Sequence, residues 1–179
     1  MEKVDERISI LKIVITGPES TGKTTLCKSL ASYFNTSYVP EYSRGYLQQQ
    51  EGKYTREDLS IIAAGQMKLE DDHQLKNKLL LICDTSLEVI RIWSEWKFKA
   101  CDKFILEHAR TRLPDLFLLL KLDFPWQPDP QRENPDDRDA LFAYYQKTLS
   151  EYNTKVIEVS GSVEERLNRA IEVIKLETG

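Results

Sequence analysis

An eight-residue segment near the start of the chain constrains the fold more than any other part of the sequence. Residues 17–24 read Gly-Pro-Glu-Ser-Thr-Gly-Lys-Thr and match the pattern Gly-x-x-x-x-Gly-Lys-Thr of a phosphate-binding loop, or P-loop. The segment follows the apolar run Ile8–Thr16, which is typical of a buried strand, and it opens a segment of helical composition. This strand–loop–helix context argues against a chance match and predicts that the chain binds a nucleoside triphosphate.

The residue types of this loop explain how it would bind ATP. Gly17 and Gly22 allow the backbone to wrap closely and to point its N–H groups inward at an anion. The following helix adds the positive end of its dipole. The positively charged Lys23 side chain would contact the β- and γ-phosphates, and the Thr24 hydroxyl would ligate Mg²⁺. The residues expected to contact the nucleotide are Gly17, Pro18, Glu19, Ser20, Thr21, Gly22, Lys23, Thr24 and Thr25.

Strand-like and helix-like segments alternate along the chain. The expected strands are Ile8–Thr16, Ser37–Val39, Leu79–Cys83, Leu116–Leu122 and Lys155–Val159. The expected helices are Lys23–Phe34, Thr55–Lys78, Leu87–Phe98, Lys103–Arg112, Arg138–Tyr152 and Ser162–Lys175. Three of the strand runs are almost continuously apolar, as in parallel sheets that are buried on both faces. The pattern predicts a three-layer α/β P-loop fold, and because no repeat or linker divides residues 1–179, we expect a single domain.

The composition narrows the class of protein. The chain has 179 residues, of which 41% are hydrophobic and 30% charged, and its net charge is −4. A mildly acidic chain of this kind is typical of a globular protein and argues against nucleic-acid binding. Three cysteines without a CxxC pair, together with two histidines, give no zinc-type ligand set. The charged start of the sequence lacks a signal-peptide core, and no apolar stretch reaches the roughly 18–20 residues that span a bilayer, so we expect a cytoplasmic protein.

An acid follows the third strand-like run. Asp84 ends the segment Leu-Leu-Leu-Ile-Cys-Asp, which has the form of the second magnesium-binding strand (Walker B) of P-loop proteins. We therefore expect Asp84 to join Thr24 at the metal ion. The alternative is that Asp84 only caps the helix that opens near Leu87.

A proline-rich segment, Asp123–Asp139, has no helical or strand period and contains four of the seven prolines. Because a phosphoryl-transfer enzyme must exclude water, such a segment is expected to be a lid, with Arg132 and Arg138 neutralising charge on the transferring phosphoryl group. The alternative is a solvated loop whose arginines pair with neighbouring acids. No Asn-Lys-x-Asp guanine signature and no second domain are present, so the lid favours a small-molecule kinase over a GTPase or a motor.

A polar segment, Pro40–Arg44, follows the second strand and should lie at the same sheet edge as the P-loop. There Glu41 would accept the proton of an acceptor hydroxyl, while Tyr42 and Arg44 would line the acceptor pocket. The alternatives are that Glu41 is a surface acid at the start of the next helix and that Tyr42 fills the core.

Taken together, these motifs resemble the ribosylnicotinamide kinase domain of a bifunctional bacterial NAD-salvage protein and its stand-alone P-loop relatives. The resemblance covers nearly the whole chain and rests on Gly17–Thr24, Pro40–Arg44, Gly65-Gln66, Asp84-Thr85, and Asp123–Asp129 with Arg132 and Arg138. It implies ATP-dependent phosphorylation of nicotinamide riboside to nicotinamide mononucleotide, a five-stranded parallel sheet of order 2-3-1-4-5, and Glu41 as general base. It places Ser160–Ser162 beside the adenine. The substrate-binding residues it implies are Glu41, Tyr42, Arg44, Gln66, Asp84 and Trp126.

One position departs from this pattern. The bifunctional members often carry a tryptophan before the Glu-Tyr pair, where this chain has Pro40. Tyr42, Trp93 or Trp126 would therefore have to offer the aromatic face that a cationic ring prefers. Trp93 and Trp96 fit equally well as core residues of one helix. The sequence shows no counterpart of the helix-turn-helix and adenylyltransferase parts, which argues against direct gene regulation. A kinase for another nucleoside or small metabolite and an ATP-binding regulatory or sensor module are the alternative functions.

Overall fold

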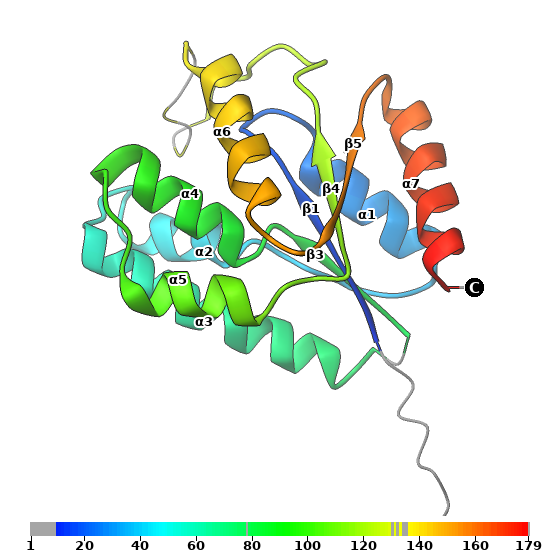
Figure 1. Cartoon of the computed structure of the whole chain (residues 1–179), viewed down its shortest axis with the longest axis horizontal. Helices are drawn as coiled ribbons and strands as arrows, with labels where there is room; N and C mark the ends of the chain where they lie inside the picture. The colour runs from blue at the N-terminus through cyan, green and yellow to red at the C-terminus, as the bar shows by residue number, and fades with distance from the viewer. Residues whose placement is uncertain (1–9, 78, 130, 132, 134–135, 179) are drawn as a thin grey trace, which may run out of the picture.

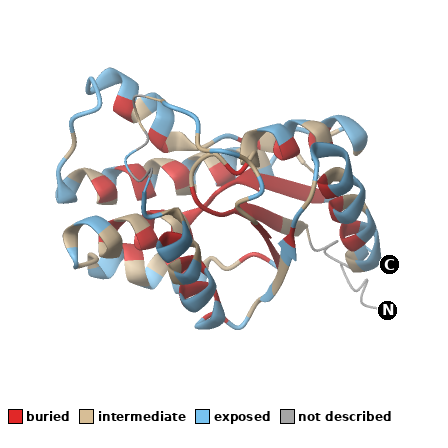
Figure 2. Cartoon of the chain, turned by 90° about the horizontal axis from the view of Figure 1, so that it is seen from above, coloured by how far each residue is buried: buried red, intermediate tan, exposed pale blue. Residues whose placement is uncertain are grey.

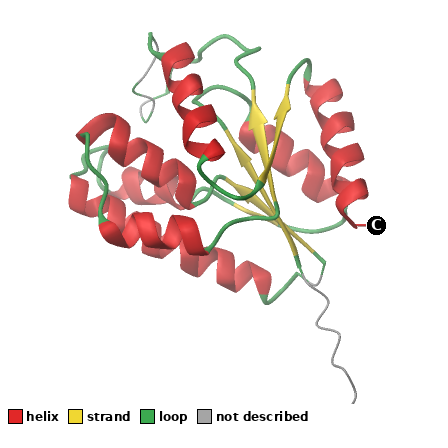
Figure 3. Cartoon of the chain, in the orientation of Figure 1, coloured by secondary structure: helices red, strands yellow, loops and turns green. Residues whose placement is uncertain are grey.

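Five short strands form one parallel sheet in the computed structural model, which describes residues 10–77, 79–129, 131, 133 and 136–178 (Figures 1 and 3). The strands are β1 (Leu11–Thr16), β2 (Tyr38–Val39), β3 (Leu80–Asp84), β4 (Leu116–Leu120) and β5 (Lys155–Val159). Their order is β2-β3-β1-β4-β5, and every neighbouring pair is parallel. The predicted α/β class and the strand order implied by the resemblance are both confirmed.

Helices follow the strands and pack on both faces of the sheet (Figure 1). They are α1 (Lys23–Tyr33), α2 (Tyr42–Gln49), α3 (Arg56–Gln74), α4 (Leu87–Phe98), α5 (Lys103–Thr111), α6 (Arg138–Ser150) and α7 (Val163–Thr178). The α2 helix is not among the expected helices, because its eight residues combine a central glycine with polar residues and are too few to show a clear apolar period. In the described part of the chain, no helix combines the length and the apolar character needed to cross a membrane.

The sheet separates two hydrophobic cores. Alternate residues of β1 point to opposite faces: Ile13 and Ile15 pack with α1 and α7, whereas Val14 packs with α3, α4, α5 and α6. Both faces are therefore covered, and the buried sheet is visible between the helical layers in Figure 2. This double burial explains why the strands read as continuous apolar runs in the sequence.

The parallel arrangement brings the carboxyl ends of all five strands to one edge of the sheet. The P-loop leaves β1 at this edge, Glu41 follows β2, Asp84 ends β3, Asp123 follows β4 and Gly161 follows β5. Ligands of open α/β sheets bind at this edge, where strand order reverses on either side of β1. The fold thus gathers the predicted functional segments in one place.

A close contact holds α2 against α3. A Cβ atom on Gly65 of α3 would lie 2.2 Å from the ring of Tyr42, so no residue larger than glycine fits there without displacing the tyrosine. Beside this contact, the Tyr42 backbone N–H donates a hydrogen bond to Gln66 Oε1 (2.9 Å). The Gly65-Gln66 pair, which is part of the family resemblance, therefore forms the docking surface for α2.

We expect Gly65→Ala to lower the free energy of unfolding by about 1–3 kcal/mol, because Tyr42 must move to make room for the methyl group. Gly45→Ala in α2 is the matched control, since no heavy atom lies within 4 Å of its added Cβ. That change should be neutral or stabilising by up to about 1 kcal/mol. Urea unfolding of both variants measures the difference, and equal effects would contradict the close contact.

Candidate active site

The two glycines of the P-loop are required by its backbone geometry. Gly17 and Gly22 have φ angles of 138° and 85°, which side chains other than glycine rarely tolerate. A Cβ on Gly17 would also lie 2.9 Å from the Leu120 carbonyl oxygen, and one on Gly22 would lie 3.3 Å from the Phe124 ring. The loop therefore passes close to both the end of β4 and the segment after it, which places the anion-binding N–H groups at the sheet edge.

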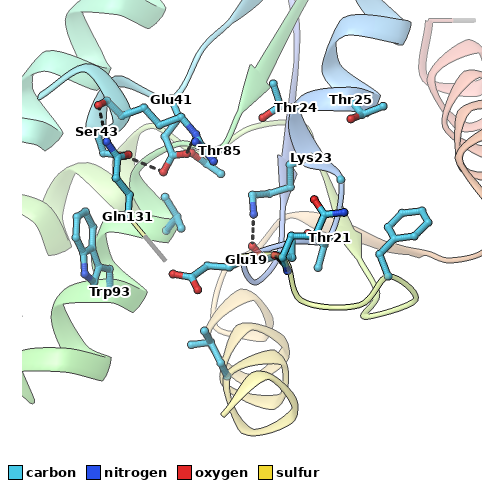
Figure 4. A pocket seen from close by; sticks show the side chains of 18 of the residues that line it. Glu19, Thr21, Lys23, Thr24, Thr25, Glu41, Ser43, Thr85, Trp93 and Gln131 are labelled. Atoms are coloured by element: carbon cyan, nitrogen blue, oxygen red, sulfur yellow. Dashed lines mark hydrogen bonds and ion pairs between the residues drawn. The ribbon is translucent and has the colours of Figure 1, made fainter. Parts of the chain in front are cut away.

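Lys23 reaches back over the P-loop. Its Nζ donates hydrogen bonds to the carbonyl oxygens of Gly17 (2.9 Å) and Pro18 (2.8 Å). Figure 4 shows the Lys23 side chain with a hydrogen bond to the loop. Burial lowers the pKa of the Lys23 ammonium, and the carboxylates of Glu41, Asp84 and Glu19 act in the opposite direction. Lys23 thus lies in a cluster of opposite charges beside the phosphate-binding loop.

Thr24 and Asp84 meet directly. The Thr24 hydroxyl donates to Asp84 Oδ2 at 2.5 Å, and only 2% of Asp84 is exposed. Burial raises the pKa of Asp84, while the Thr24 hydrogen bond and the Lys23 charge lower it. Asp84 Oδ1 is buried and has no hydrogen-bond partner among the described residues. A hydroxyl beside a carboxylate with a spare oxygen fits the ligand preference of Mg²⁺.

A cavity of about 410 Å³ opens over the P-loop and extends toward α2 and α4. Its polar wall carries P-loop residues together with Glu41, Ser43, Arg44 and Thr85. Its apolar and aromatic wall consists of Leu47, Tyr54, Val89, Ile92, Trp93, Trp96, Leu141 and Tyr145. One continuous cavity therefore joins a phosphate site to a largely apolar compartment.

Glu41 lies on the side of this cavity that faces Lys23 (Figure 4). It is the residue at the N-cap of α2, and its Oε1 accepts a hydrogen bond from the Ser43 hydroxyl (2.8 Å). Its Oε2 lies 3.5 Å from Arg44 Nε. The two interpretations of Glu41 are therefore compatible: it begins the next helix and it also lines the cavity.

The remaining predicted residues divide into two groups. Arg44 and all the expected P-loop residues except Pro18 line the cavity, whereas Tyr42, Gln66, Asp84, Trp126 and Arg138 are not among its lining residues. Tyr42 and Gln66 lie at the α2–α3 contact, and Asp84 lies behind Thr24. Trp126 has a buried indole Nε1 without a hydrogen-bond partner in the described part of the chain. Arg132 lies outside the described residues.

The described part of the proline-rich segment lies against the P-loop. The Gln127 N–H donates to Ser20 Oγ (3.1 Å), and the Glu133 N–H donates to Glu19 Oε1 (3.1 Å). Arg138 donates to two backbone carbonyls, those of Phe124 (2.9 Å) and Glu19 (3.4 Å). These hydrogen bonds place the segment where it borders the phosphate site.

Arg166 is the main site residue that the sequence did not reveal. Arg166 is only 2% exposed. Its guanidinium donates hydrogen bonds to the carbonyl oxygens of Gly161 (2.9 Å), Thr21 (2.5 Å) and Lys121 (2.9 Å) and to the carboxylate of Asp123 (2.7 Å). It also lies over the Phe124 ring, 4.4 Å from its centroid. Nothing in the sequence distinguishes Arg166 from the exposed arginine one turn later, so only the fold identifies it.

Asp123 is held by the same cluster. Its limited burial acts to raise its pKa, but hydrogen bonds from Arg166 and the Gly161 N–H outweigh that and lower it. The segment after β4, the loop after β5 and the P-loop are thus joined through one cation and one carboxylate. This arrangement fixes the border of the cavity on the α7 side.

Comparison with known proteins places this site in a family. A family model described as an AAA domain matches residues 12–166. The chain belongs to the AAA domain family. The chain is 29% identical over 172 residues to the trifunctional NAD biosynthesis/regulator protein NadR of Salmonella typhimurium (strain LT2). The alignment covers 91% of the chain but 42% of the relative, so the chain spans less than half of that protein. The resemblance inferred from the motifs is confirmed.

Solved structures show the same fold. The AAA domain matches NadR protein in complex with NR with a TM-score of 0.77 and 22% identity, covering 95% of this chain and 50% of that one. It also matches a thymidylate kinase from Ehrlichia chaffeensis with a TM-score of 0.64 and 15% identity, covering 92% of this chain and 98% of that one. The chain therefore has the same fold as these two proteins.

We expect Arg166→Met to destabilise the chain by about 1–3 kcal/mol, because three backbone carbonyls lose their hydrogen-bond donor, whereas the partly exposed Asp123 can be solvated. Arg169→Met on the same helix is the control, since Arg169 is half exposed and its ion pair within the described residues is with Glu172. Its effect should stay below about 1 kcal/mol. Chemical denaturation compares the two, and a similar small loss for both variants would contradict the structural role of Arg166.

A second buried acid gives a prediction about pH. Glu88, in the first turn of α4, is 3% exposed, and its Oε1 accepts the Ser86 N–H at 3.3 Å. Burial raises the pKa of Glu88 from its ordinary value of 4.5 to about 7. Between these values the folded chain binds a proton that the unfolded chain releases, so this group lowers stability as pH rises through the window.

We therefore expect Glu88→Gln to be more stable than the wild type at pH 8, by up to roughly 3 kcal/mol. The advantage should shrink as the pH falls toward 5, where the wild-type carboxyl is protonated in the folded state. Thermal and urea unfolding between pH 5 and 8 measure it, with Glu107→Gln at an exposed position of α5 as control. A pH-independent difference would contradict the assigned shift.

Proposed function

We propose that this chain is an ATP-dependent kinase that phosphorylates the 5′-hydroxyl of nicotinamide riboside and so forms nicotinamide mononucleotide in NAD salvage. The observation that carries the proposal is the single cavity in which Glu41 faces the Lys23 end of the P-loop. The similarity to NadR, whose name states a role in NAD biosynthesis and whose solved structure contains NR, supports this acceptor.

ATP and Mg²⁺ would bind at the P-loop side of the cavity. The P-loop N–H groups and Lys23 would hold the β- and γ-phosphates, with Lys23 exchanging its present carbonyl partners for phosphate oxygens. Thr24 and Asp84 would hold the Mg²⁺ ion, which when bound neutralises charge on the phosphates. The loop around Gly161, which Arg166 joins to the P-loop, would border the adenine.

Glu41 would act as the general base. The acceptor hydroxyl would transfer its proton to the Glu41 carboxylate as its oxygen bonds to the γ-phosphorus, while the bond from that phosphorus to the β-phosphate oxygen breaks and releases ADP. Hydrogen bonding by Ser43 and the nearby Arg44 guanidinium would fix the orientation of the carboxylate. Arg44 would also line the acceptor pocket, as the sequence predicts.

The aromatic wall would receive the acceptor's cationic ring. Of the three aromatic residues that could replace a tryptophan at Pro40, Trp93 lines the cavity, while Tyr42 and Trp126 are not among the lining residues. The Trp93 indole is oriented by its hydrogen bond to the Tyr54 hydroxyl (2.8 Å). A pyridinium ring stacked on Trp93 would gain a cation–π interaction that a neutral base lacks.

The proline-rich segment would serve as the lid and exclude water during transfer, with Arg138 and Arg132 as its candidate cations. Because Arg138 bonds to the carbonyls of Phe124 and Glu19, it would have to turn from this position to reach a phosphoryl group. As part of the proposal, the enzyme works as a single domain in the cytoplasm on a small nucleoside, without a nucleic-acid partner.

An acceptor panel tests the proposal. ADP release is followed with ATP-Mg and, in turn, nicotinamide riboside, nicotinic acid riboside, adenosine, thymidine and no acceptor. We expect nicotinamide riboside to stimulate ADP release well above the rate with water. If another nucleoside stimulates ADP release and nicotinamide riboside does not, that nucleoside is the acceptor and the proposed substrate is wrong. If no acceptor stimulates ADP release, the regulatory or sensor alternative is favoured.

The role of Glu41 is tested with Glu41→Gln, which keeps the size of the side chain but removes the base. We expect acceptor-dependent kcat to fall by about 10²–10⁴-fold, because proton removal loses its catalyst. ATP affinity should stay close to that of the wild type, and Glu107→Gln is the control. Full turnover in the Glu41→Gln variant would remove Glu41 from the base role.

A further inference from the structure

The start of α2 is oriented by another helix. Glu41 occupies the N-cap of α2, but its side chain makes no capping hydrogen bond. The first helical N–H, that of Tyr42, donates instead to Gln66 Oε1 in α3 (2.9 Å). Because helix starts leave their first N–H groups without intrahelical partners, this contact determines how the first turn of α2, and with it Glu41, is placed.

The Gln66 amide has a defined orientation. Gln66 is 2% exposed, and its Nε2 donates to Glu70 Oε1 at 3.3 Å. Glu70 is 1% exposed and its carboxylate can only accept hydrogen bonds when ionised. The amide nitrogen must therefore face Glu70, which leaves the amide oxygen facing the Tyr42 N–H.

Glu70 is in turn connected to the loop that follows β3. Its Oε1 accepts a hydrogen bond from the Ser86 hydroxyl (2.5 Å), and its Oε2 is paired with the Lys12 ammonium (2.8 Å). Ser86 is two residues beyond Asp84 and forms the N-cap of α4. A buried chain of hydrogen bonds thus runs from the backbone beside Glu41 to the backbone beside Asp84.

We infer that Gln66 and Glu70 form a positioning pair that sets the place of Glu41 relative to the Thr24–Asp84 site. The inference rests on the proposed function, in which Glu41 is the base and Asp84 holds the metal ion. Neither residue of the pair lines the cavity, and none of the described hydrogen bonds of the pair reaches the P-loop. The close contact of Gly65 with Tyr42 is a second, independent sign that this part of α3 is shaped to locate α2.

This role differs from the direct substrate contact that the family resemblance implied for Gln66. A residue that contacts the acceptor changes KM when it is removed, whereas a residue that places the base changes the rate of proton removal at saturating acceptor. Small displacements of a catalytic group are costly, with about 1 Å corresponding to as much as about 100-fold in rate. The two roles therefore predict different kinetic signatures.

Gln66→Met is the primary test, because methionine keeps the volume of the side chain but neither donates nor accepts as the amide does. We expect acceptor-dependent kcat to fall by about 10- to 100-fold, with KM for the acceptor and the Kd for ATP-Mg each within about 3-fold of the wild type. Gln74→Met, at an exposed position of the same helix, is the control and should leave all three values unchanged. A rise in KM at constant kcat would overturn the inference in favour of direct substrate binding.

A double-mutant cycle with Glu41→Gln shows whether Gln66 acts through Glu41. If it does, Gln66→Met should have little further effect on kcat once the base is gone, so the two effects should be far from additive. Additive effects would overturn the positioning role. If Gln66→Met does not fold, the same cycle with Glu70→Gln, which keeps the size of the side chain but removes the carboxylate that orients the Gln66 amide, gives the same distinction.

The cycle separates this inference from the proposed function. It is run with whichever nucleoside the acceptor panel identifies, so a different acceptor would change the proposed function and leave the coupling measurable. Full turnover in Glu41→Gln alone would remove the base on which the inference depends. A large loss in Glu41→Gln that adds independently to the loss in Gln66→Met would leave the proposed function standing and overturn the positioning pair.

Discussion

The buried guanidinium of Arg166 holds the carboxyl edge of the sheet together. A charge in this position is costly to desolvate, and the cost is offset only because its donors reach three carbonyls and a carboxylate at 2.5–2.9 Å. These partners belong to the P-loop, the end of β4 and the loop after β5. The phosphate site keeps its shape because three loops that have no regular structure of their own share one cation.

The opposite side of the cavity is organised by a different kind of contact. There α2 is placed by helix α3, through the close approach of Gly65 to Tyr42 and the hydrogen bond from Tyr42 to Gln66. The position of Glu41 is therefore determined by residues that do not line the cavity. The P-loop side of the cavity is held by the contacts of Arg166, and the Glu41 side is positioned by α3 residues that do not line the cavity.

Charge balance connects the two halves. Lys23 lies among Glu41, Asp84 and Glu19, and each carboxylate counteracts the effect of burial on its pKa. Asp84 and Thr24 share a short hydrogen bond, and the other carboxylate oxygen of Asp84 has no hydrogen-bond partner among the residues that the structure describes. The arrangement concentrates opposite charges where a triphosphate and a divalent cation would need them, while Trp93 and its neighbours provide an apolar compartment beside it.

The parallel sheet and the phosphate-binding loop were determined by the sequence alone. Continuous apolar runs identified buried parallel strands, and Gly17, Gly22 and Lys23 identified the P-loop, because these signals are local and depend on neighbouring residues in the chain. Tertiary structure decided the rest. The α2 helix is short and contains a central glycine, Arg166 looks like any other arginine in its helix, and Gln66 lies at the α2–α3 contact and outside the cavity lining. Each depends on contacts between segments far apart in the chain, and such contacts leave no periodic pattern that a single sequence can show.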